Sequence, residues 1–248
     1  DERTRLAGNN CYQCHMPKAE TNVAHAAFHH HRIGIHEENG GSAEEAVKGL
    51  APVLDVPSLS ERERQRCAAI AKVNLIRKKK NIPDLETYAM DATGTLIQLK
   101  QTGPLDAVAN SKLAWLAQAQ GQTNIAEDLA KETLTLEPRP TLARIDATSI
   151  LAAIAFQKGD KERAAKLYRE VNQQDRDSYE LYYLGLSENN VGNVGAAIAA
   201  LEKSLELDPL QVSSHSALRA IYHAKGNLAK SAFHEQAALR NQTLIETL

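Results

Sequence analysis

The sequence has few aromatic residues, no long apolar run and no excess of one charge sign, and each shortage narrows the choice of fold. Phe, Trp and Tyr together make up 4% of the 248 residues, while Ala and Leu are common, and this balance favours helices over sheets. The longest strongly apolar run, residues 150–156, is much shorter than the roughly 20 residues that a membrane-spanning helix needs. The formal net charge is -2 with mixed signs, so no footprint for nucleic acid is visible. We therefore expect an all-α protein with no transmembrane segment and no nucleic-acid partner.

Cysteine is scarce as well. The three cysteines are too few for a disulfide framework. Cys11 and Cys14 form one motif, and we expect Cys67 to lie buried on the apolar face of a helix.

The sequence also lacks a Gly-rich phosphate loop, a Ser–His–acid order and an H-E-x-x-H helix, so we expect no hydrolytic or transfer site. Because the first residue is Asp1, we expect that a leader was removed or that upstream sequence is missing.

Composition predicts three regions along the chain. Residues 1–41 contain Asn, His and Gly without sustained periodicity, and they form the first region. Residues 42–104 show helical signals, which indicate degenerate helix pairs. Within them, a Ser and a Glu three residues apart predict a helix that runs from residue 60 to a basic cluster at 77–80. A second helix is expected to begin at residues 83–84 and to end near residues 103–104.

Residues 105–248 contain an internal repeat of about 34 residues. Frames that begin at Ala107, Ile145, Ser178 and Val212 each place a Leu at position 7 and a small residue at position 20. Position 15 is glycine in every frame: Gly121, Gly159, Gly192 and Gly226. This spacing resembles the tetratricopeptide repeat, which implies a solenoid of about four helix–turn–helix units, the last of them a cap.

The motif that carries chemistry is Cys11-Tyr12-Gln13-Cys14-His15, the C-x-x-C-H pattern of c-type haem attachment. Thiols at Cys11 and Cys14 can add across the two vinyl groups of one porphyrin, and His15 can then bind the iron. A structural zinc site completed by His15 and a later histidine is the main alternative. A redox dithiol and a chance match are weaker alternatives.

Histidine is also favoured as the second axial ligand. Met16 adjoins His15, and Met90 is expected in a helix of the repeat scaffold, so neither methionine suits the opposite face of a haem. The candidates are His25, His29, His30, His31 and His36. Two histidine ligands would close both axial positions, and such a haem passes electrons.

Residues 11–33 resemble a segment of certain multihaem cytochromes c, in which C-x-x-C-H-M-P is followed by histidines and an H-R-I sequence. Some bacterial members carry tetratricopeptide repeats directly afterwards. The resemblance implies that His31, or else His25, is the distal ligand. The chain has a single C-x-x-C-H, so one of these histidines is either structural or a ligand to a haem outside the chain.

The expected function is electron transfer by one covalently bound haem c, docked or assembled through the helical repeats. A lone haem implies a redox protein, other haem-bearing chains or further copies of this chain as partners. Because c-type haem is attached outside the cytoplasmic membrane in bacteria, we expect a periplasmic or extracellular protein. The alternatives are a tetratricopeptide adaptor with a structural zinc site and an electron-relay subunit of a multihaem oxidoreductase.

The tetratricopeptide resemblance also implies a partner groove. In that family, positions 2, 5, 9 and 12 of the first helix of each repeat face the partner. The residues that we expect there are Trp115, Phe156, Tyr179, Tyr182 and His223. They predict an aromatic surface for a peptide or protein, although some of them could instead pack between repeats.

Overall fold

The structure is a computed structural model, which describes residues 18–19, 28–29, 59–78, 85–138, 140–174 and 177–246. The chain divides into two units, Asp1–Gly49 and Leu50–Leu248. In the first unit, strands β1 (Lys18–Ala19) and β2 (Phe28–His29) pair antiparallel, with Lys18 opposite His29.

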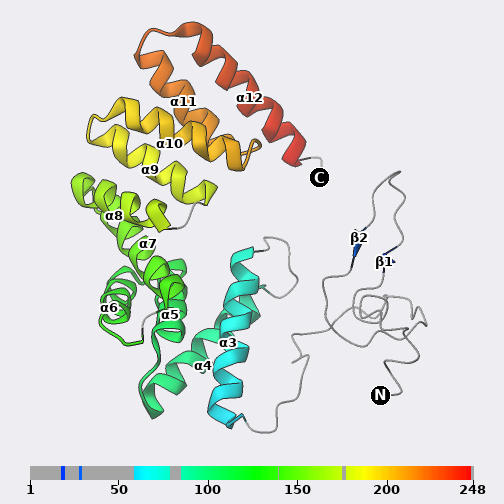
Figure 1. Cartoon of the computed structure of the whole chain (residues 1–248), viewed down its shortest axis with the longest axis vertical. Helices are drawn as coiled ribbons and strands as arrows, with labels where there is room; N and C mark the ends of the chain where they lie inside the picture. The colour runs from blue at the N-terminus through cyan, green and yellow to red at the C-terminus, as the bar shows by residue number, and fades with distance from the viewer. Residues whose placement is uncertain are drawn as a thin grey trace, which may run out of the picture. The chain divides into compact units, whose positions relative to one another are not determined.

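The described part of the second unit is all-α and consists of helical hairpins that follow one another along the chain (Figure 1). Its ten helices are α3 (Glu61–Lys78), α4 (Leu85–Thr102), α5 (Ala107–Ala119), α6 (Thr123–Thr133), α7 (Thr141–Gln157), α8 (Lys161–Gln174), α9 (Ser178–Asn190), α10 (Val194–Leu207), α11 (Val212–Ala224) and α12 (Leu228–Glu246). None of the helices described is both long enough and apolar enough to cross a bilayer. The boundaries of the three predicted regions, after residues 41 and 104, stay predictions.

A glycine closes the turn inside each of the last four hairpins. Gly121, Gly159, Gly192 and Gly226 have φ angles of 74°, 74°, 84° and 71°, in the left-handed region that glycine enters without strain. The following amide then bonds back to the first helix, as when Gln122 N donates to Ala117 O at 2.9 Å. The glycine that recurs at position 15 therefore ends the first helix of each unit, as expected from the repeat.

Small residues let the two helices of a hairpin approach closely. Ala197 in α10 is fully buried, and the opposing residue in α9 is Gly185. A Cβ atom added at Gly185 would lie 2.5 Å from Leu201 Cγ and 3.2 Å from Ala197 O, which is inside van der Waals contact. The backbones of α9 and α10 are therefore as close as they are because position 185 has no side chain.

Two clusters of apolar side chains form the core of the helical unit. The first runs from α3 to α7 and includes Val73, Leu96, Leu116 and Ile154. The second joins α10 to α11 around residues such as Leu201 and Leu218. Each hairpin thus buries its apolar stripe against its neighbours, as expected for a solenoid.

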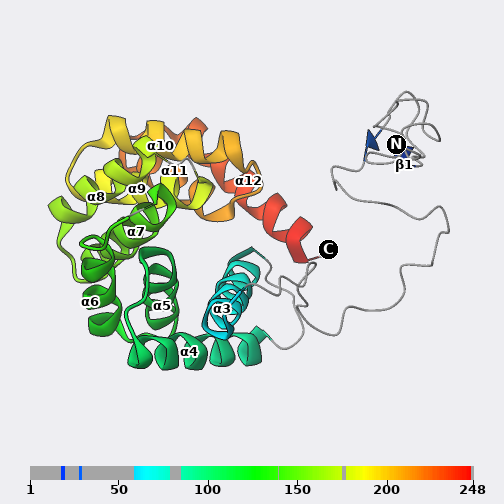
Figure 2. The same ribbon diagram turned by 60° about the horizontal axis from the view of Figure 1, so that its bottom comes forward.

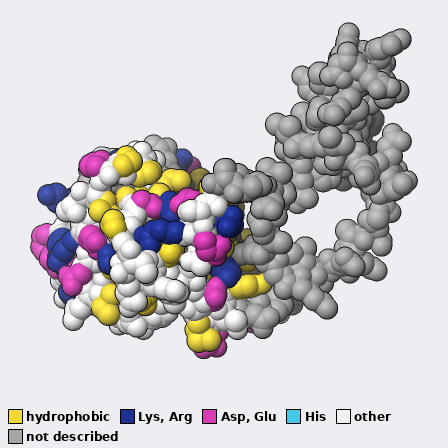
Figure 3. Space-filling view, turned by 90° about the horizontal axis from the view of Figure 1, so that it is seen from below, with side chains coloured by type: hydrophobic (Ala, Val, Ile, Leu, Met, Phe, Trp, Pro, Cys, Tyr) yellow, Lys and Arg dark blue, Asp and Glu magenta, His cyan; other side chains and the backbone are white. Residues whose placement is uncertain are grey.

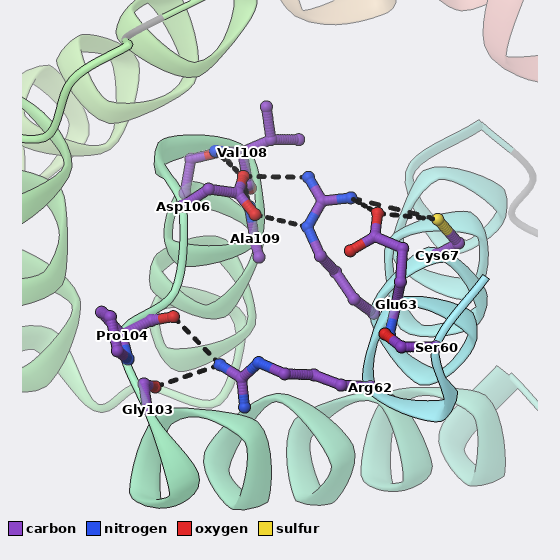
Figure 4. Close-up of polar contacts among 11 residues, drawn as sticks. Ser60, Arg62, Glu63, Cys67, Gly103, Pro104, Asp106, Val108 and Ala109 are labelled. Atoms are coloured by element: carbon purple, nitrogen blue, oxygen red, sulfur yellow. Dashed lines mark hydrogen bonds and ion pairs between the residues drawn. The ribbon is translucent and has the colours of Figure 1, made fainter. Parts of the chain in front are cut away.

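Two arginines of α3 attach the first hairpin to the second (Figure 4). Arg62 donates to the carbonyl oxygens of Gly103 at 3.2 Å and Pro104 at 3.0 Å, just after α4 ends. Arg66 forms an ion pair with Asp106, and Asp106 caps α5 by accepting from Val108 N at 2.9 Å. Burial would raise the pKa of Asp106, but the bonds from Arg66 and the backbone outweigh it and lower that pKa.

The start of α3 agrees with the capping signal, whereas the position of Cys67 does not agree with our prediction. Glu63 N donates to Ser60 Oγ at 3.2 Å, as expected of a helix N-cap. Cys67, expected to be buried, is exposed. The buried side of α3 carries Ala69 and Val73, and a residue two positions before Ala69 points about 200° away from it on a helix. The Sγ atom lies instead 3.6 Å from Glu63 Oε1.

Candidate partner-binding face

The first helices of the hairpins lie on the inner side of the curve of the helical unit, with α4, α6 and α8 on its outer side (Figure 2). We call the surface of α5, α7 and α9 around Trp115, Asp146 and Tyr179 the inner face.

Trp115 is half-buried and packs on the first core cluster, and His223 is exposed in the last turn of α11. Phe156 and Tyr182 are half-buried, and Tyr182 packs against the second core cluster. Of the five predicted residues, Phe156, Tyr179 and Tyr182 are brought together through Tyr183.

A cluster of aromatic rings covers the junction of α7, α8 and α9. Tyr183 is its centre: its ring centroid lies 5.1 Å from Tyr179, 5.0 Å from Tyr182, 5.6 Å from Phe156 and 5.7 Å from Tyr168. We call these five residues the aromatic cluster. Tyr168 is 1% exposed and fixes the cluster in the core, whereas Tyr179 is 57% exposed and presents its ring to solvent. The cluster therefore offers an aromatic surface with a rigid support.

The hydroxyls of Tyr168 and Tyr183 stay protonated at neutral pH. The hydroxyls of Tyr179 and Tyr183 lie 3.4 Å apart, and this hydrogen bond, together with burial, raises the pKa of Tyr183. Burial raises the pKa of Tyr168 as well, and the negative charge of Glu180 adds to that shift. These phenols are therefore neutral hydrogen-bonding groups rather than bases.

An ionic network lies next to the aromatic cluster. Asp146 on α7 pairs with Lys112 of α5 at 2.7 Å and with Arg77 of α3 at 2.7 Å. The guanidinium of Arg77 also lies 5.8 Å from the centroid of the Trp115 ring, which is within the range of a cation–π interaction. Arg77 lies exposed in the last turn of α3, as expected for the basic end of that helix, and it also holds the Asp146 carboxylate.

Glu180 adds a carboxyl group that forms no ion pair with any of the residues the structure describes. Its Oε1 atom accepts a short hydrogen bond from Ser149 Oγ on α7. Burial raises the pKa of Glu180, and the nearby negative charges of Asp177 and Asp146 raise it further, while Arg77 opposes them. The inner face thus combines exposed aromatic surface with a partly buried acid, a set of groups suited to recognition.

The residues that the structure describes contain no cluster of three or more His, Cys, Asp or Glu side chains placed to hold a metal ion. Basic and acidic side chains are interspersed with hydrophobic ones on the side shown in Figure 3, rather than gathered into a field of one sign. The coloured part of that side therefore shows no surface of a single charge sign.

A buried histidine pair that no sequence motif indicated lies in the last hairpin. His215 of α11 and His234 of α12 are each 8% exposed, and their Nδ1 atoms lie 2.9 Å apart. Tyr222 stacks on the ring of His234 at a centroid distance of 5.7 Å. Burial lowers the pKa of both histidines. The pair joins the two helices of one hairpin.

The haem-related residues lie outside the described residues. These are Cys11, Cys14, His15, His25 and His31. The haem c site and the alternative zinc site therefore stay predictions.

Comparison with known proteins identifies the fold alone. No protein-family model matches the chain, and no curated protein matches it. A crystal structure of MamA is similar with a TM-score of 0.56 and 19% identity, covering 66% of this chain and 94% of that one. A double mutant of MamA from strain RS-1 has a TM-score of 0.58 and 16% identity, covering 77% of this chain and 100% of that one. A structure of MamA from Desulfovibrio magneticus RS-1, from residue 41 to the end, has a TM-score of 0.56 and 16% identity. It covers 75% of this chain and 98% of that one.

The described helices therefore form a tetratricopeptide-type array like that of MamA. This fold agrees with the solenoid that the repeat spacing predicts. None of these comparisons supports the cytochrome resemblance of residues 11–33.

Proposed function

We propose that this chain is a protein-interaction module, and that the inner face of its helical array binds a segment of a partner polypeptide. The observation that carries the proposal is Tyr179, a large aromatic side chain that is 57% exposed on α9. Tyr183, which stacks on the buried Tyr168, contacts the ring of Tyr179 and holds it in place, so binding would cost little side-chain entropy.

The surroundings of Tyr179 also support this proposal. Aromatic residues and arginine are enriched where protein interfaces carry most of their binding energy. Here Trp115 and Arg77 lie on the same face, beside the ion pair of Lys112 with Asp146. An adaptor of this kind was the first alternative to electron transfer, and the fold supports it better than it supports a cytochrome.

Peptide selection on the full chain tests the proposal. Peptides selected from a random-sequence library should bind the unchanged protein and lose at least about tenfold in affinity when Tyr179 is changed to alanine. The control is Glu162→Gln, which alters an exposed residue of the outer helix α8. If the selected peptides bind both variants equally, the inner face is not the binding surface.

A second candidate function, electron transfer through haem c, rests on the C-x-x-C-H motif at residues 11–15. Cys11 and Cys14 would hold the porphyrin through thioether links, His15 would bind the iron, and His31 or His25 would be the distal ligand. The haem would supply one-electron chemistry, and the helical array would dock this chain on a redox protein or on other haem-bearing chains. Such a protein belongs in the periplasm or outside the cell. The zinc-site adaptor and the electron-relay subunit remain the alternatives.

An absorption spectrum and an intact mass of the purified chain separate these candidates. Haem c predicts a sharp Soret band that stays with the protein in acid–acetone, and a mass increased by one haem. A colourless protein that contains zinc and has the mass of its amino acids alone would exclude haem c. A bound haem together with reductase activity would favour the relay subunit.

A further inference from the structure

We propose that the partner segment places an arginine or lysine side chain on the inner face, with its cation over the Tyr179 ring and paired with the Glu180 carboxylate. This inference rests on the proposed function, because it specifies the chemistry of the partner at the same surface.

The first argument is the charge balance around α9. Asp146 already has two cations, Lys112 and Arg77, each at 2.7 Å. Glu180 takes part in none of the ion pairs formed among the described residues. Its carboxylate accepts a hydrogen bond from the neutral hydroxyl of Ser149. Asp177 adds a further exposed negative charge at the N-cap of α9, where it accepts from Tyr179 N at 2.8 Å. Among the described residues at the start of α9, Asp177 and Glu180 are therefore negative and none is positive.

The second argument is the position of Tyr179. Its ring is more than half exposed, and the neighbouring residue along α9 is Glu180. A guanidinium or ammonium over a tyrosine face gains about 0.5–1 kcal/mol at an exposed site and more where water is excluded. In the proposed complex, the carboxylate of the next residue, Glu180, would add a charge-assisted hydrogen bond to the same cation.

The third argument is that the protein already uses this arrangement once on the same face. The guanidinium of Arg77 lies 5.8 Å from the centroid of Trp115 and 2.7 Å from a carboxylate oxygen of Asp146. An aromatic ring and a carboxylate thus hold a cation between α5 and α7. Tyr179 and Glu180 on α9 are again an aromatic ring and a carboxyl group, and they form no ion pair among the described residues.

Other partner chemistries fit less well. An acidic side chain would approach Glu180 and Asp177 and be repelled by both. A purely apolar side chain would cover the Glu180 carboxyl without giving it a hydrogen-bond donor, which is costly for a polar group. A basic side chain instead satisfies the carboxyl and neutralises the excess charge.

The test uses peptides selected on the full chain from a random-sequence library. We expect them to contain an arginine or lysine whose replacement, citrulline for arginine or acetyl-lysine for lysine, weakens binding about tenfold or more. Glu180→Gln should weaken the original peptide similarly and should leave the neutral analogue unaffected. Glu162→Gln on α8 is the matched control and should change neither affinity. Raising the salt concentration should weaken the original peptide more than the neutral analogue.

Two outcomes overturn the inference and are distinguishable from each other. If peptide binding depends on Tyr179 but the neutral analogues bind as tightly as the original peptides, the partner does not need a basic side chain. The inference then fails and the proposed function stands. If the peptides bind independently of Tyr179, both the inference and the proposed function fail. The neutral analogues are measured on the unchanged protein, so the result does not depend on the folding of Glu180→Gln.

Discussion

Lys112 and Asp146 form an ion pair between α5 and α7 that is almost out of contact with water. The Nζ–Oδ2 distance is 2.7 Å, and the two side chains are 9% and 11% exposed. The second partner of Asp146, Arg77, is 35% exposed. One carboxylate thus neutralises a buried cation and also holds the end of α3 against the third hairpin.

Replacing Asp146 by alanine is expected to destabilise the protein by about 3 kcal/mol, because it leaves Lys112 as a buried charge without a partner. Arg77→Ala removes only the more exposed cation and should cost less than about 1 kcal/mol. Urea unfolding of both variants, followed by circular dichroism, measures the difference. Equal losses in the two variants would mean that the Lys112–Asp146 pair is not the main contribution.

Gly185→Ala should also destabilise the protein, by about 1–3 kcal/mol, because the new methyl group would overlap Leu201 and force the helices apart. The matched control is Gly195→Ala in α10, where an added Cβ meets no atom within 4 Å. That change should stabilise the helix by about 0.5–1 kcal/mol. Thermal unfolding should therefore shift in opposite directions for the two variants, and a shift in the same direction would contradict the close approach of α9 and α10.

Glu127 gives the protein a pH-dependent contribution in the acid range. Its carboxylate accepts from Lys158 at 2.5 Å and Lys131 at 2.9 Å, and these bonds lower its pKa to about 2. The contribution of these bonds to the free energy of unfolding is complete above the ordinary pKa of 4.5, and it is lost as the pH falls towards 2. Glu127→Gln should cost about 2 kcal/mol at pH 7 and progressively less below pH 4.5. A stability difference that does not change with pH would exclude this assignment.

The histidine pair of the last hairpin should make the stability of the protein depend on pH in a less acidic range than Glu127 does. Burial holds the pKa of His215 and His234 below the ordinary 6.5, so the unfolded chain takes up protons first as the pH falls. Stability is then complete above pH 6.5 and decreases below it. His234→Phe keeps an aromatic ring against Tyr222 and removes one titrating group, so the fall in stability between pH 7 and pH 5 should become smaller.

The control for the histidine pair is His223→Asn, which changes an exposed histidine of α11. Urea unfolding of this variant should show the same fall in stability below pH 6.5 as the unchanged protein. If His234→Phe also leaves the fall unchanged, the pair does not cause it.

The repeat spacing predicted most of the fold because its signals are local. Gly121 and its equivalents end helices through their own backbone conformation, and Ser60 caps α3 through a neighbouring amide. Contacts between distant residues could not be predicted in this way. Arg77 and Asp146 are 69 residues apart, and no spacing rule indicates that they meet.

The inner face was only partly predictable for the same reason. Tyr179 and Tyr182 lie at family positions that face a partner, but Tyr183 at position 6 was missed, although it joins the rings of the aromatic cluster. The helical phase around Cys67 could have been read from the sequence, since Ala69 and Val73 are four residues apart and define the buried side of α3.

Amide hydrogen exchange of the full chain with and without a selected peptide tests the proposed binding surface most directly. The account predicts that the peptide slows exchange in α7 and α9, with little change in the outer helices α6 and α10. Slower exchange confined to those outer helices would contradict it.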